Sequence, residues 1–224
     1  MEPVSAPTIE VVSCIPTSHG RLRRIGNGSR ESPMKGVLAV AHPSWDRDVQ
    51  REHLDEAVEI LLGGLASVSR DISRSNEFES VLQKCIHSCH LLVQEREFYM
   101  SSLLWCYDGS LMQLAGIGWT FGWHAKLGQL TQVLTPTSAT IDGAGTVLIA
   151  SIGLGEIDGA TNNVVIPSSD ESRFCFTIAS NKGNSHAGCP ATDRFLKEFG
   201  PDYLSEVGGH QALCILEPGS RSAG

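Results

Sequence analysis

The chain has 224 residues, of which 41% are hydrophobic and 19% are charged, a composition typical of one folded globular domain. Its formal net charge of −8 argues against a nucleic-acid partner, which would need a basic face. No run approaches the roughly 20 apolar residues that cross a bilayer, and the N-terminus shows no basic-then-apolar leader. We therefore expect a cytoplasmic protein without a membrane partner, whose seven cysteines are mostly buried free thiols.

The first part of the chain is predicted to form two strands and then two long helices. Short valine-rich apolar runs bounded by Gly or Pro are typical of buried strands. Leucines and valines that recur at helical spacing indicate amphipathic helices. These rules predict strands over residues 9–15 and 35–41, and helices over residues 49–68 and 77–93.

The rest of the chain is predicted to be mainly a strand meander. Asp108-Gly109 is a strong two-residue hairpin signal between strands expected at 98–107 and 111–118. Residues 153–172, rich in Gly, Asn, Ser and Asp, are predicted to be mainly loop with a short strand at 164–166. The remaining predictions are strands at 119–125, 130–134, 146–150, 173–179 and 212–216, a turn at 126–129 and a helix at 190–204. This order favours an α+β layered fold over a doubly wound parallel sheet.

The order of these elements, together with several short motifs, resembles the metal-dependent protein phosphatase 2C family. Thr17 to Arg23 (TSHGRLR) resembles the family's opening strand, and Val37 to Ala41 resembles the strand that leads into its first metal loop. Val147 to Leu154 resembles the strand that normally ends in Ser-Asp-Gly-Leu. Residues 101–118, 128–135 and 211–216 resemble its central hairpins and closing strand. The resemblance covers about residues 9–217 of a single domain (1–224) and implies an α-β-β-α sandwich of two antiparallel sheets flanked by helices.

The departures from the family pattern concern its metal ligands. Members hold two Mg²⁺ or Mn²⁺ ions with carboxylates, because hard divalent cations prefer charged oxygen ligands. The resemblance assigns four core ligand positions to Gly28, His42, Ile152 and Gly209. Gly and Ile offer no ligand atom, and one histidine makes a poor Mg²⁺ site. We therefore expect no catalytic metal ion, no cofactor and a lost two-metal phosphatase site.

Two further features are candidates for binding. Arg23 matches the family's phosphate-contacting arginine, although an exposed strand arginine paired with a nearby acid is an equal alternative. Strand alternation places Trp119, Phe121 and Trp123 on one face and His124 on the other. The aromatic residues are predicted to form either sheet core or an aromatic-lined pocket for a small organic ligand or a peptide.

Two clusters could in principle bind a metal ion. Cys85 and Cys89 lie four residues apart and share one helix face, but no second ligand pair is present, so a buried structural role is favoured over a zinc site. Asp46 and Asp48 follow His42 and could provide substitute oxygen ligands, although charged loop residues are usually solvated.

Three functional hypotheses follow. The first is a non-catalytic pseudophosphatase, a binding or regulatory protein that recognises a protein partner, including a phosphorylated one through Arg23. The second is a metal-independent enzyme that acts on a small molecule in the vacated cleft, lined by His42, His210 and the aromatic strand. The third, and least favoured, is an active phosphatase with ligands relocated to Asp46, Asp48, Asp142 and Asp158.

Overall fold

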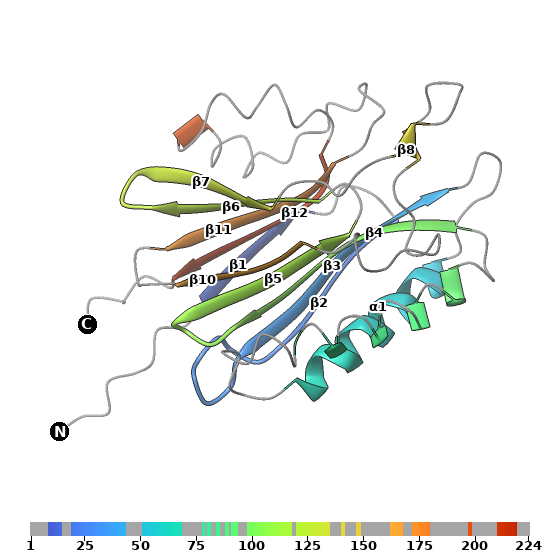
Figure 1. The fold of residues 1–224 in the computed structure, drawn as a ribbon, viewed down its shortest axis with the longest axis horizontal. Helices are drawn as coiled ribbons and strands as arrows, with labels where there is room; N and C mark the ends of the chain where they lie inside the picture. Colours follow the sequence, from blue (N-terminus) through green and yellow to red (C-terminus); the bar gives the residue numbers. More distant parts are fainter. Residues whose placement is uncertain are drawn as a thin grey trace.

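Two five-stranded antiparallel sheets face each other, and helix α1 (Arg51–Ser67) covers the outer side of one of them (Figure 1). The structure is a computed structural model that describes residues 9–14, 19–43, 51–68, 78, 80–81, 84–85, 88–89, 91–93, 98–117, 120–134, 140–141, 147–148, 162–167, 172–179, 197–198 and 210–218.

The strand order of each sheet mixes strands from distant parts of the chain. Sheet A has the order β1 (Ile9–Cys14), β12 (His210–Pro218), β11 (Arg173–Ala179), β6 (Thr120–Lys126) and β7 (Gln129–Leu134). Sheet B has the order β10 (Asn162–Pro167), β5 (Leu111–Ile117), β4 (Phe98–Tyr107), β3 (Met34–Pro43) and β2 (Gly20–Ile25). A separate pair joins β8 (Thr140–Ile141) to β9 (Val147–Leu148).

Strand β3 carries an uninterrupted apolar run because it contributes side chains to the cores on both faces of sheet B. Leu38 and Val40 belong to the core between the two sheets, whereas Val37, Ala39 and Ala41 belong to the core under α1. A strand that is buried on both faces carries an uninterrupted apolar run instead of strict alternation. The side chains of β4 alternate between the two cores in the same way. Its Trp105 lies in the intersheet core, at a ring-centroid distance of 5.7 Å from Phe176 of β11.

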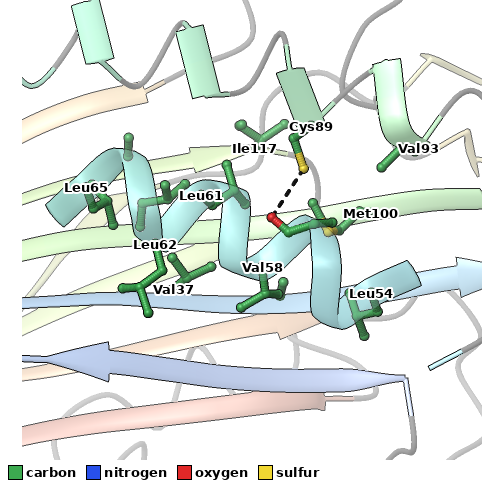
Figure 2. Close-up of a cluster of buried hydrophobic side chains, with 14 of the residues drawn as sticks. Val37, Leu54, Val58, Leu61, Leu62, Leu65, Cys89, Val93, Met100 and Ile117 are labelled. Atoms are coloured by element: carbon green, nitrogen blue, oxygen red, sulfur yellow. Dashed lines mark hydrogen bonds between the residues drawn. The ribbon is translucent and has the colours of Figure 1, made fainter. Parts of the chain in front are cut away.

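Helix α1 seals the outer face of sheet B with its apolar stripe (Figure 2). Leu54, Val58, Leu61 and Leu65 recur at helical spacing and are buried against the sheet. Cys89, which is helical, covers α1 from the other side, and its thiol donates to the Ala57 carbonyl at 3.6 Å.

Charged groups fix the position of α1 on sheet B. Arg21 of the edge strand β2 forms an ion pair with Asp55, and Arg23 Nε lies 3.2 Å from Glu59 Oε1. At the other end of the helix, the buried Lys35 ammonium donates to the Val68 carbonyl at 2.6 Å. A cation at a helix C-terminus satisfies otherwise unpaired carbonyls and complements the helix dipole.

Strand directions define two ends of the sandwich. β3 and β5 are both antiparallel to β4, so both finish at the same end, and only residues 118 and 119 separate β5 from β6. β6 therefore begins at this end, where β11 finishes and β12 begins. We call this end, with Gly20, Ala41, His42, Ile117, Thr120, Ala179 and His210, the crossover end. The opposite hairpin end holds the connections 26–33, 108–110 and 127–128.

The predicted α+β sandwich of two antiparallel sheets is confirmed, and most predicted strands are found within two residues of their expected bounds. At the Asp108-Gly109 hairpin, the Asp108 carboxylate accepts hydrogen bonds from the backbone N–H groups of Ser110 (2.9 Å) and Leu111 (2.8 Å). The short strand predicted at 164–166 is β10, which extends to six residues in a segment otherwise predicted to be mainly loop. β10 forms because it pairs with β5 along its full length, a tertiary contact that local composition does not encode.

The two remaining helix predictions fall partly outside the described residues. Of the helix expected at 77–93, residues 78, 80–81, 84–85, 88–89 and 91–93 are described and helical. Of the helix expected at 190–204, only residues 197 and 198 are described, and both are helical. Among the helices that the structure describes, none is both long and apolar enough to cross a membrane.

Candidate functional site

The structure places the backbones of His42 and His210 at the same end of the sandwich. His42 is the penultimate residue of β3, and His210 is the first residue of β12. The two strands belong to different sheets and contact each other across the sandwich. The crossover end is therefore the candidate site, because it joins positions that are 168 residues apart in the sequence.

Gly28 does not lie at this end. It belongs to the connection between β2 and β3 at the hairpin end, where its backbone N–H donates to the Ser32 carbonyl at 3.1 Å. Eight residues of extended strand separate Met34 from His42, or about 26 Å. The four assigned ligand positions are thus not gathered at one place. Ile152 and Gly209 lie outside the described residues.

The position opposite the end of β3 is instead His19, which sequence reasoning had not singled out. The Ala41 backbone N–H donates to the His19 carbonyl at 2.9 Å, one residue before β2 begins. The register of the β2–β3 hairpin, in which Gly20 pairs with Val40, carries this information. The order of short motifs along the sequence does not show which residues face each other across a hairpin. It therefore could not place His19 opposite the end of β3.

Arg23 lies on the outer, helix-facing side of sheet B, at its edge. Its guanidinium is paired with Glu59 at 3.2 Å and lies 3.8 Å from Asp55. The structure thus shows the alternative that the sequence left open, a strand arginine paired with neighbouring acids. Arg23 pairs with Val37, on the α1 side of sheet B, so it does not face the intersheet layer.

The aromatic residues of β6 also lie away from His42. Phe121 and Trp123 pair with Thr177 and Cys175, which alternate with the intersheet residues of β11, so the two rings lie on the outer face of sheet A. They stack at a centroid distance of 5.8 Å with an interplanar angle of 6°, and both are buried. The predicted alternation along β6 is correct, but these rings do not join His42 and His210. Trp119 lies outside the described residues.

His124 faces the other way, into the intersheet layer at the hairpin end. Its ring stacks on Phe174 at a centroid distance of 4.7 Å, and Nε2 lies 2.9 Å from Ser172 Oγ. Burial lowers the pKa of His124 below its usual value, and the nearby Lys126 lowers it further. Because β6 runs from the crossover end to the hairpin end, His124 and His210 do not share a site.

Small residues and hydroxyls line the described part of the crossover end in the intersheet layer. A side chain at Gly116 would collide with the hydroxyl of Thr120 and lie 2.6 Å from Leu134 Cδ2, so the two sheets approach closely here. Thr120 is fully buried, and its hydroxyl has no hydrogen-bond partner among the residues that the structure describes. An unpaired buried hydroxyl costs free energy of folding, which makes this position unusual.

The cysteine pair has the structural role that its spacing favoured. Cys85 lies directly against Gly64 of α1, and Cys89 is fully buried. Burial raises the pKa of Cys85. Burial also raises the pKa of Cys89, to about 12, and the neighbouring Cys85 contributes to this rise. Both groups are therefore neutral thiols at physiological pH in the metal-free chain. Within the described ranges, no three His, Cys, Asp or Glu side chains converge as a metal site would require.

Comparison with known proteins identifies the fold. No model of a protein family and no curated protein matches the sequence. The solved serine/threonine phosphatase Stp1 from Staphylococcus aureus is similar over 98% of this chain and 98% of that chain, with a TM-score of 0.63 at 7% identity. The S. agalactiae serine/threonine phosphatase gives a TM-score of 0.63 at 10% identity, over 94% and 99% of the chains.

A third solved structure, the catalytic domain of the serine/threonine phosphatase PstP in complex with 2 manganese ions, gives a TM-score of 0.57 at 10% identity. It matches over 93% of this chain and 97% of that chain. At such low identities these likenesses establish the fold alone. The chain has a phosphatase-2C-like fold, as the order of its sequence elements predicted.

Thr120→Val should stabilise the protein by about 1 kcal/mol, because a methyl group replaces a buried hydroxyl that has no partner. The matched control is Thr177→Val on β11. Thr177 is equally buried but has an interaction partner, so this change should destabilise the protein by about 1 kcal/mol. Urea unfolding of both variants measures the two free energies. A loss of stability in Thr120→Val would show that the hydroxyl is satisfied in solution.

His124 should make the folded state less stable in mild acid. Its pKa is lower in the folded than in the unfolded chain, so the unfolded chain binds more protons between the two values, and stability rises with pH there. Acidification from about pH 7.5 to 5.5 should therefore reduce the urea midpoint of the wild type more than that of His124→Phe. Equal acid sensitivity in wild type and His124→Phe would contradict the assignment.

Proposed function

We propose that this chain is a non-catalytic binding or regulatory protein, a pseudophosphatase on a phosphatase-2C-like fold. The observation that carries the proposal is the set of residues at the crossover end. The positions that β3 and β12 bring there are His42 and His210, and the nearby described residues of the intersheet layer are small, apolar or hydroxyl-bearing. The described part of this layer contributes no carboxylate.

This donor set does not fit a pair of Mg²⁺ or Mn²⁺ ions. Such ions need several converging oxygen ligands, usually carboxylates, to generate a hydroxide nucleophile and to hold the phosphate. Asp55 of α1 is already paired with Arg21 on the helix side of sheet B. The described residues thus offer no ligand set for a manganese pair like the one bound by PstP. This supports a loss of phosphatase chemistry.

The partner that we propose is a protein, and the likeness to serine/threonine phosphatases makes a phosphorylated one a natural candidate. Arg23 is 44% exposed and could receive a phosphate only by exchanging its contacts with Glu59 and Asp55. Binding through this arginine therefore needs a local rearrangement, and the intersheet layer is not involved in it. We propose a cytoplasmic location for this interaction.

Purified protein should show no turnover of an aryl phosphate at millimolar Mn²⁺, because the described site lacks carboxylate ligands for the metal pair. The positive control is the S. aureus phosphatase of the same fold, assayed at equal concentration. The four acidic residues Asp46, Asp48, Asp142 and Asp158, which lie outside the described residues, are the candidates for relocated ligands. EDTA-sensitive turnover that remains with the protein through purification and is lost in Asp→Asn variants of these residues would overturn the proposal.

A second candidate, a metal-independent enzyme that acts on a small molecule, is favoured by one observation. The fold brings two histidine positions, 42 and 210, to facing strand ends, and paired imidazoles can act as general acid and base. The aromatic strand no longer belongs to this hypothesis, because Phe121 and Trp123 lie on the outer face of sheet A. If a screen of small ester and amide substrates finds turnover, His42→Ala and His210→Ala should each lower it by about 100-fold or more. Unchanged turnover in both variants would eliminate this candidate.

A further inference from the structure

Strand β7 is an open edge of sheet A, and its side chains carry no charge (Figure 1). Its first five residues are exposed or half-buried, namely Gln129, Leu130, Thr131, Gln132 and Val133. Among the described strands, only β6 pairs with it. The outer side of an edge strand presents a row of unpaired N–H and C=O groups, which is a template for pairing with another chain.

The other three edges of the two five-stranded sheets carry a charge or a proline. Strand β1 contains Glu10, and β10 ends at Pro167. On β2, the guanidinium groups of Arg21 and Arg23 each donate to the carbonyl of the preceding residue, at 2.7 and 3.4 Å. Charges and prolines of this kind protect an edge against strand addition. Strand β7 has neither form of protection.

The turn between β6 and β7 determines which backbone groups of β7 face outward. Leu127 and Gly128 have φ values of 53° and 75°, the left-handed conformation of both central residues in a type I′ turn. The two residues that flank such a turn exchange backbone hydrogen bonds, and the pairs alternate from there. The backbone groups of Leu130 and Gln132 therefore point away from β6, and the register shift of this hairpin lies beyond them.

These two outward-facing positions are spaced for antiparallel pairing of β7 with its own copy. When Leu130 of one chain lies opposite Gln132 of the second copy, a two-fold axis creates the reciprocal pair as well. Thr131 then lies opposite Thr131 of the second copy, in a pair without hydrogen bonds whose Cβ atoms are about 4.5–5.5 Å apart. Two copies of a chain with a net charge of −8 repel each other, so an uncharged edge is where they can meet.

Leu127, at the tip of the hairpin, is 73% exposed in a conformation that leucine rarely adopts. Asn, Asp and Gly are the usual residues at this position of the turn. In the two-fold register, the turn of one chain lies beside the last residues of β7 in the other chain. Pairing therefore removes from water part of an apolar side chain that the isolated chain exposes.

We propose that two copies of this chain associate through their β7 edges, as a two-fold antiparallel strand pair that joins sheet A of one copy to sheet A of the other. A single strand pair buries less surface than a standard stable interface, so the dimer is weak and depends on concentration. This inference goes beyond the proposed binding function and does not depend on it.

Sedimentation equilibrium of the full chain tests the proposal, and it should show a monomer–dimer mixture at about 100 µM and a monomer at about 1 µM. Thr131→Lys and Thr131→Glu should each weaken dimerisation by about tenfold or more, because like charges then meet at the two-fold axis. An equimolar mixture of these two variants should associate to within about threefold of the wild type, because Lys then faces Glu. The control Arg24→Ala, on the edge strand β2, should dimerise as the wild type does.

Cross-linking provides a second readout of the register. Under mild oxidation with copper–phenanthroline, Thr131→Cys should form a disulfide-linked dimer, because the two-fold axis brings its two Cβ atoms together. The wild type and Gln129→Cys, whose position faces Val133 of the second copy, should cross-link far less. Leu127→Asn should weaken dimerisation without lowering the urea midpoint of the monomer, since Asn suits the turn better than Leu.

Three results would each overturn the proposal. A wild type that stays monomeric at both concentrations would leave the β7 edge to a different occupant, such as a strand of another protein. Wild-type dimerisation in both charge variants of Thr131 would place the interface elsewhere. Cross-linking of Arg24→Cys in place of Thr131→Cys would assign the dimer to the β2 edge. None of these results bears on the phosphatase assay, so the failure of either idea can be recognised separately.

Discussion

Burial of sheet B on both faces is the constraint on which the rest of the structure depends. Its strand β3 contributes Leu38 and Val40 to one core and Val37, Ala39 and Ala41 to the other. One core needs sheet A as its cover, and the other needs α1 and the helical residues after it. Because hydrophobic burial is the dominant stabilising term, neither cover can be removed without exposing a full face of the sheet. The layer order of the fold follows from this requirement.

The same constraint determines where functional groups can lie. A strand that is buried on both faces can offer reactive side chains only at its ends, since its middle positions are filled with apolar contacts. The connections between the two sheets are short at the crossover end, where residues 118 and 119 are enough to pass from β5 to β6. The backbone of His42 is at the end of such a strand, and close sheet approach at Gly116 brings polar Thr120 into the intersheet layer at the same end. The hairpin end, by contrast, is closed by tight turns such as Asp108-Gly109-Ser110.

The sequence was sufficient for elements whose signal is local. The bounds of β4 and β11 were predicted to the residue, because aromatic and β-branched residues fill them and turn residues bound them. β10 was predicted too short, at 164–166, since Asn162 and Asn163 resemble loop and its partner β5 is distant in sequence. The position of Gly28 was assigned by counting along the chain, whereas hairpin register decides which end a residue occupies. The positions of Arg23 and of the Phe121 and Trp123 rings could not be predicted from the sequence, because they depend on which face of each sheet is covered.

The central proposal is that the crossover end of this phosphatase-2C-like fold does not hold a two-metal site. Anomalous X-ray diffraction from crystals soaked in Mn²⁺ tests it most directly. We predict no manganese peak at the crossover end. Two manganese peaks about 3.5–4 Å apart at this end, the spacing of a catalytic metal pair, would contradict the proposal.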